Sequence, residues 1–176
     1  MVGEAPLEQT ENGVVPSGEG WFVVNAAETP WWQSGHFGAS TSFEGEPEFP
    51  EYGINIHVLW PGQPNGLYHR ESVQEDFLVV SGECLVLIEG EERRLKTWDF
   101  VHCPAGTEHI FVGAGDGTCV IVMAGSRAPS TIVYPVSEVA ARHGASAAEE
   151  TDAPKEAYAP FDRGGAGPMP NGALPG

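Results

Sequence analysis

A short segment near residue 70 concentrates side chains that can bind a metal or transfer a proton. His69 and Glu71 are separated by a single residue, and Glu75 follows after a short polar stretch. In a β-strand, residues i and i+2 project from the same face, so His69 and Glu71 would share one face. A tight turn after Glu71 would return Glu75 to that side at the start of the next strand.

A second histidine follows a turn further along the chain. The sequence CPAGTEH, residues 103–109, places His109 just after a Pro/Gly turn. Two imidazoles and one carboxylate form a facial triad that leaves coordination positions open for water or substrate. Such a set suits Fe(II) and also accepts Zn²⁺, Mn²⁺ or Ni²⁺. The residue types therefore predict a site for one divalent transition metal per chain, if the two segments meet in the fold.

The elements that must position these residues are short β-strands. Residues 53–60 alternate, with Ile54, Ile56, Val58 and Trp60 on one face and Asn55, His57 and Leu59 on the other. Further strand candidates follow at close intervals between turn signals: residues 67–71, 77–80, 84–88, 93–95, 100–103, 109–112 and 118–123. Many short strands at this spacing predict an all-β sandwich or barrel.

Other polar residues near these segments are expected to lie outside the site. By parity with His69, Tyr68 and Arg70 should face away from the candidate ligands. The other four histidines are expected to be ordinary surface or core residues: His36, His57, His102 and His143. Of these, His57 is the one that a neighbouring strand could aim inward.

The composition excludes several classes of protein. A chain of 176 residues suits one domain with a sizeable core, and its net charge of −17 disfavours nucleic acid and anionic membranes as partners. The 23 Gly and 15 Pro favour many turns over an all-helical fold. The three cysteines lack Cys-x-x-Cys spacing, and the first residues do not resemble a signal peptide. We therefore expect a cytoplasmic protein without a disulfide framework or a membrane span.

The two segments with candidate ligands resemble the conserved motifs of the cupins, which are small metal-binding β-barrels of the double-stranded β-helix type. Glu75 and Gly82 match the Glu-x6-Gly half of the first cupin motif. Pro104, Gly106 and His109 match the Pro-x-Gly-x2-His half of the second. The resemblance covers residues 53–125 and implies an all-β, jelly-roll-like barrel, here with a short C-terminal helix.

The resemblance also implies a set of metal ligands. A three-residue spacer before Glu75 assigns His69, Glu75 and His109 to the metal and puts Glu71 at the position of the family's second histidine. Glu71 is then either a fourth ligand or a nearby general base with a catalytic role. A four-residue spacer would put Tyr68 and Arg70 at the histidine positions, and an arginine cannot lose its proton to bind a metal. Fe(II) and Zn²⁺ are the expected ions, with Mn²⁺ or Ni²⁺ as alternatives.

The spacing of the implied ligands is also similar to that in 3-hydroxyanthranilate dioxygenases, which are cupins with two histidines and one glutamate on Fe(II). The arginines that clamp the substrate there would fall near Asn65 and Gly113, which cannot hold a carboxylate. We predict a metal-dependent oxygenase that acts on a small organic molecule. Few cationic side chains are expected to point into the barrel, since Arg70 faces out and Arg93, Arg94 and Lys96 lie in a turn-flanking strand, so a neutral or apolar molecule is favoured. The alternative is a non-catalytic cupin that binds or senses a small ligand.

The chain divides into three parts by composition. Residues 1–19 are predicted to be a flexible arm, residues 20–136 a cupin barrel with its motifs in 53–125, and residues 137–176 a short helix and a loose tail. Ser137 can cap that helix, and Tyr158 and Phe161 could pin part of the tail. Aromatic residues near the chain ends suggest contact with a second copy, so we expect a homodimer.

Overall fold

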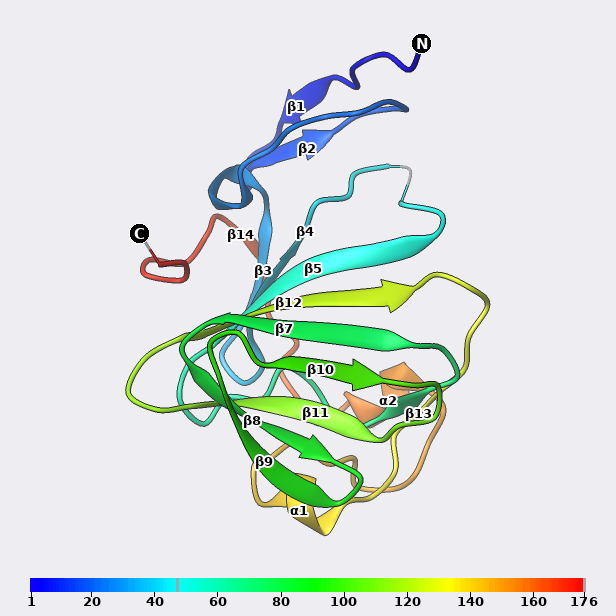
Figure 1. Cartoon of the computed structure of the whole chain (residues 1–176), viewed down its shortest axis with the longest axis vertical. Coiled ribbons are helices and arrows are strands. Elements are labelled where there is room, and N and C mark those ends of the chain that lie inside the picture. Colours follow the sequence, from blue (N-terminus) through cyan, green and yellow to red (C-terminus); the bar gives the residue numbers. More distant parts are fainter. Residues whose placement is uncertain (47, 176) are drawn as a thin grey trace.

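The structure, a computed structural model, describes residues 1–46 and 48–175 and consists mainly of β-strands (Figure 1). The strands are β1 (Leu7–Gln9), β2 (Val14–Pro16), β3 (Trp31–Ser34), β4 (Gly38–Ser42), β5 (Tyr52–Leu59), β6 (Arg70–Glu71), β7 (Glu75–Ser81), β8 (Glu83–Ile88), β9 (Glu91–Lys96), β10 (Phe100–Cys103), β11 (His109–Ala114), β12 (Cys119–Ser126), β13 (Ile132–Val133) and β14 (Gly165–Gly167). The helical turns are η1 (Ala26–Glu28), α1 (Glu138–Ala141) and α2 (Pro154–Ala157). The all-β prediction is confirmed. No helix in the described residues is long and apolar enough to cross a membrane.

Two antiparallel sheets form the barrel. The larger sheet has the strand order β10-β7-β12-β5-β4-β3-β14, and the smaller has the order β11-β8-β9. A hydrophobic core lies between them: Phe77, Val79 and Ile121 come from the larger sheet, and Val86 and Phe111 come from the smaller. Because the inner faces of both sheets contribute to one cluster, the strands enclose a single apolar interior.

Strand β5 has the two faces that its alternating sequence predicts. Leu59 belongs to the core between the sheets, whereas Val58 packs with Trp31 and other residues on the opposite face. In the pairing with β12, Asn55 lies opposite Met123 and His57 lies opposite Ile121. Both partners belong to the core between the sheets, so Asn55 and His57 project to the inner side of the barrel.

The turn from β7 to β8 requires a glycine. Gly82 has a φ of +76°, and a Cβ atom there would lie 2.2 Å from the carbonyl oxygen of Thr118. Any other side chain would therefore collide with backbone in addition to adopting a left-handed conformation. This close approach explains physically why the Glu-x6-Gly pattern ends in glycine.

Both ends of the chain contain regular structure that their composition does not suggest. Strands β1 and β2 pair as a hairpin, and β14 pairs with β3. The predicted helix is present as α1, where the Ser137 hydroxyl accepts a hydrogen bond from the Ala140 amide at 3.2 Å. Helix α2 was not expected, because its four residues lie in an acidic, Pro-rich segment. The division into arm, barrel and tail at residues 19 and 136 remains a prediction.

Candidate metal centre

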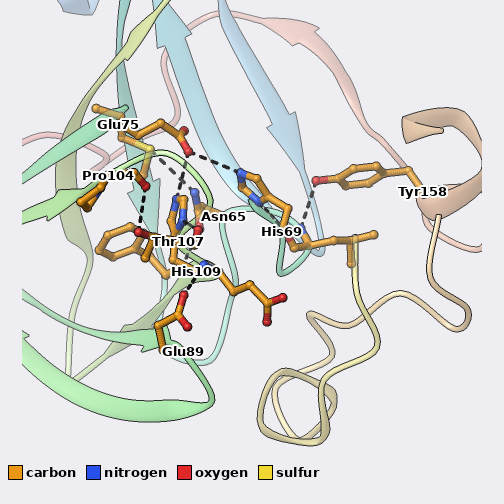
Figure 2. A network of polar contacts seen from close by, with 12 residues as sticks. Asn65, His69, Glu75, Glu89, Pro104, Thr107, His109 and Tyr158 are labelled. Atoms are coloured by element: carbon orange, nitrogen blue, oxygen red, sulfur yellow. Dashed lines mark hydrogen bonds and ion pairs between the residues drawn. The ribbon is translucent and has the colours of Figure 1, made fainter. Parts of the chain in front are cut away.

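Three side chains predicted as ligands converge inside the barrel (Figure 2). His69 lies just before β6, Glu75 begins β7 and His109 begins β11. Backbone hydrogen bonds join His69 and His109 in both directions, with N to O distances of 3.2 and 2.8 Å. This bridge holds the two imidazole rings with their centroids 4.9 Å apart, although the residues are forty positions apart in sequence.

The potential ligand atoms are close enough to share one ion. The Oε2 atom of Glu75 lies 3.4 Å from Nε2 of His109 and 4.0 Å from Nε2 of His69. One ligand atom from each residue falls within 4.8 Å of the other two. A carboxylate and two imidazoles from three separate segments thus surround one point, as a facial triad requires.

The outer nitrogen of each ring is already engaged. Nδ1 of His69 donates to the Leu67 carbonyl oxygen at 2.8 Å, and Nδ1 of His109 donates to the Thr107 carbonyl oxygen at 3.1 Å. These bonds fix the tautomer and leave the Nε2 lone pair of each ring directed at Glu75. The Pro/Gly turn before His109 therefore orients the ring of that residue. Near His69, the Leu67 amide donates a hydrogen bond to the Tyr158 hydroxyl at 3.0 Å.

Burial sets the protonation of the three groups. It lowers the pKa of His109 to about 4, with a smaller contribution from His69, and it also lowers the pKa of His69. Burial raises the pKa of Glu75 to about 7, and the nearby carboxylate of Glu71 adds to this effect. At neutral pH both imidazoles are neutral and can coordinate, while the carboxyl group of Glu75 is poised between its two forms.

Glu71 lies in the same cavity but outside the cluster of three. It lines the cavity with the ligands, and its backbone carbonyl accepts a hydrogen bond from Gly106 at 2.7 Å. Its two predicted roles, as a fourth ligand or as a base, remain predictions. Arg70 points elsewhere, as parity predicts, because its guanidinium pairs with Glu108 at 2.6 Å. Tyr68 is buried away from the site, with its hydroxyl accepting from the Gly90 amide.

The cavity beside the triad has a volume of about 520 Å³. Its walls combine apolar or aromatic side chains with neutral polar ones: Phe77, Ile110, Met123, Ile132, Tyr134 and Tyr158, and Asn55, His57 and Asn65. Next to Glu75 the floor is bare backbone, because Glu75, Gly125 and Gly53 lie side by side across β7, β12 and β5. Gly125 leaves room for a ligand beside the carboxylate, whereas the guanidinium of Arg127 lies over Gly53.

Sequence reasoning missed one cation at the cavity wall. Arg127 lines the cavity, and a Cβ atom on Gly53 would lie 2.9 Å from its guanidinium. Its charge is already compensated, since it pairs with Glu44 at 2.5 Å and with Glu48 at 3.2 Å. Tyr134 and Tyr158 were also missed as lining residues. All three come from segments far from the motifs, so no local spacing could have assigned them to the cavity.

Of the four histidines outside the triad, one lines the cavity and three do not. His57 lines the cavity, as its inward face predicts. His36 contacts the Gly144 carbonyl, His102 pairs with Asp76, and His143 pairs with Glu92. These three do not line the cavity.

Comparison with known proteins agrees with this fold and site. Residues 55–125 match the family described as Cupin domain, a segment that contains all three ligands. The matched segment therefore forms a cupin domain, and its His/Glu/His cluster is a candidate metal site of the kind typical of cupins. A search of curated proteins finds no match.

Solved structures with TM-scores above 0.5 share this fold, although their descriptions differ. The polyketide cyclase RemF from Streptomyces resistomycificus is 13% identical, with a TM-score of 0.54 over 62% of this chain and 83% of that one. An RmlC-like cupin from Shewanella frigidimarina is 18% identical, with a TM-score of 0.52 over 60% of this chain and 89% of that one. A sugar phosphate isomerase of the cupin superfamily from Silicibacter pomeroyi is 26% identical, with a TM-score of 0.49 over 53% of this chain. This chain spans 62% of that isomerase's length.

Proposed function

We propose that this cupin binds one divalent transition metal through His69, Glu75 and His109 and acts on a small organic molecule as a non-haem oxygenase. The observation that carries the proposal is the convergence of the three ligand atoms beside a cavity, with both Nε2 lone pairs preset by backbone hydrogen bonds. A divalent ion held there, with Fe(II) or Zn²⁺ expected, would supply open positions for oxygen and a substrate atom.

The protein's own residues supply the remaining functions. Phe77 and Met123 line the cavity next to the triad and limit the access of water to the reacting atoms. Glu71 lies outside the cluster of ligands but within the same cavity, a position that suits a base that accepts a proton from the substrate. The backbone beside Glu75 leaves space for the substrate to approach.

A non-catalytic role in binding or sensing a small ligand is the second candidate. The observation that favours it is the neutralised charge of Arg127, which is the one Lys or Arg among the described residues that lines the cavity. A substrate that must be oriented by a free cation would find none there.

The proposed function is tested by loading the metal-free protein with Fe(II) under anaerobic conditions and adding nitric oxide as a stand-in for O₂. We expect a paramagnetic adduct at one equivalent per chain, because a three-ligand site leaves coordination positions open. In parallel, Glu71→Gln should keep its metal stoichiometry and bind the metal within about threefold of the wild-type affinity, because a base is not a ligand.

Two outcomes would contradict these assignments. A stoichiometric metal that forms no adduct would favour the binding or sensing role over the oxygenase. A loss of metal affinity of about tenfold or more in Glu71→Gln would assign Glu71 as a fourth ligand instead of a base. Anomalous scattering across metal edges, on protein purified without added metal, identifies the ion in either case.

We also propose that the chain forms a homodimer. Large aromatic side chains are exposed in the single chain: Trp98, just before strand β10, is 73% exposed, and Phe100, the first residue of β10, is 62% exposed. Strand β10 is an edge of the larger sheet. Aromatic residues of this kind are enriched where proteins associate. Light scattering at micromolar concentration should therefore give twice the chain mass, and a monomer would reject the proposal.

A further inference from the structure

Two polar groups on the inner face of β5 lack any hydrogen-bonding partner. The Oδ1 atom of Asn55 and the Nδ1 atom of His57 are buried, and within the described part of the chain no donor or acceptor meets either atom. Buried side-chain polar atoms are normally paired, because leaving one unpaired costs stability. Among the described residues, no other buried side-chain nitrogen or oxygen lacks a partner.

The side chains of Asn55 and His57 line the cavity that contains the triad, two residues apart on one face of β5. Their neighbours on β12 are Met123 and Ile121, which cannot form strong hydrogen bonds with them. On the other side, β4 presents Ser42 opposite Asn55 and Ser40 opposite His57, and neither hydroxyl bonds to them. Because neither neighbouring strand supplies a partner, the cavity that both side chains line is where a ligand could supply one.

We propose that Asn55 and His57, which we call the β5 wall, form a recognition site for the hydroxyl groups of a neutral ligand with an apolar ring or chain. This inference deepens the proposed function. It rests on that function only in assuming a metal in the same cavity, near the end of the bound molecule that lies away from the β5 wall. The β5 wall itself contains no metal ligand.

A hydroxyl group fits the β5 wall better than other polar groups. The amide of Asn55 can present either oxygen or nitrogen, and the ring nitrogen of His57 can donate or accept according to its tautomer. A hydroxyl both donates and accepts, so it can satisfy either group in either form. A carboxylate or phosphate can only accept, so it could satisfy the β5 wall only when both groups present donors.

The charges around the cavity also select a neutral ligand. His57 is neutral at neutral pH, because burial lowers its pKa to about 4. Arg127 is already held by Glu44 and Glu48, while Glu71 adds a negative charge. The apolar walls, which include Phe77 and Met123, match a hydrocarbon body on the ligand.

The experiment compares two probes of similar size, benzyl alcohol and toluene. Each is titrated into Zn²⁺-loaded protein, which is redox-inert, and its affinity is measured by ligand-observed NMR. We expect benzyl alcohol to bind about tenfold more tightly than toluene, because only the alcohol meets the β5 wall. Equal affinities for the two, or no binding of either, would overturn the proposal.

Variants assign the preference to the β5 wall. Asn55→Leu keeps the side-chain size, and it should reduce benzyl alcohol affinity by about tenfold while toluene affinity stays the same or rises. Without ligand, this variant should unfold at the same or a higher temperature than wild type, since it removes an unpaired buried group. Asn171→Leu, which replaces an exposed amide outside the cavity, is the matched control and should leave benzyl alcohol affinity unchanged.

The outcomes separate this inference from the proposed function. If Asn55→Leu binds benzyl alcohol as tightly as wild type, the β5 wall is not the recognition site. Asn55→Ala provides the same test if the leucine variant does not fold. Metal content is measured in every variant, and we expect one ion per chain throughout. Loss of metal from the wild type would reject the metal centre, whereas retained metal with unchanged probe affinity would reject only the β5 wall.

Discussion

Replacing His109 with alanine should abolish stoichiometric metal uptake. His109 is 2% exposed and supplies one of three ligand atoms, so no water-exposed side chain can take its place without a rearrangement of the core. Changes to residues that only orient a ligand already cost 10- to 100-fold in metal affinity, and loss of a ligand itself should cost at least about 100-fold. Elemental analysis and competition with a chromogenic chelator measure the two quantities.

The matched control for this variant is His102→Ala. His102 is also an imidazole that pairs with a carboxylate, at 2.7 Å from Asp76, but it lies outside the cavity. It should therefore keep one metal per chain at wild-type affinity. Circular dichroism must show that His109→Ala is folded, because its ring packs against Phe77 with centroids 5.0 Å apart. Full metal occupancy in a folded His109→Ala protein would exclude the proposed centre.

Metal affinity should rise about tenfold for each pH unit between about pH 5 and 7 and level off above pH 7. The metal-free protein holds one competing proton in this range, on Glu75, whose raised pKa is about 7. The histidines add no second proton, because burial lowers the pKa of His109 to about 4 and also lowers that of His69. Ordinary histidines would make the dependence steeper below about pH 6.5.

Isothermal titration in buffers of different ionisation enthalpy counts the protons released on metal binding. We expect about one proton at pH 6 and close to none at pH 8, since Glu75 is then already ionised. In Glu71→Gln the plateau should begin at a lower pH, because the variant removes the like charge that helps to raise the pKa of Glu75. Release of two or more protons at pH 6 would contradict the assignment of neutral imidazoles.

The sequence predicts the triad because the turns around its ligands require particular residue types at fixed positions. Gly82 must be glycine because Thr118 approaches it, and the Pro/Gly turn before His109 holds the carbonyl that orients the ring. Such local constraints produce fixed spacings, and the alternation in β5 likewise places His57 inside. Side-chain parity is also sufficient to exclude Arg70.

The remainder of the site depends on contacts that no local pattern records. Tyr158 reaches the backbone beside His69 from a segment about ninety residues away, and Arg127 reaches the cavity wall from beyond β12. The unpaired state of Asn55 is equally invisible in the sequence, because it depends on what the neighbouring strands fail to offer. The pairing of β14 with β3 arises for the same reason, since composition describes flexibility but not the partner that removes it.

The bare backbone beside Glu75 gives this barrel a simple means of adjusting its selectivity for ligand size. A Cβ atom on Gly125 would lie 3.8 Å from Cγ of Glu75, which is ordinary van der Waals contact, so small side chains can be added there without displacing the carboxylate. Each added methyl group would make the chamber shallower while the metal ligands stay in place. A single mutation at Gly125 could therefore make the cavity select a smaller bound molecule, while the candidate metal ligands stay the same.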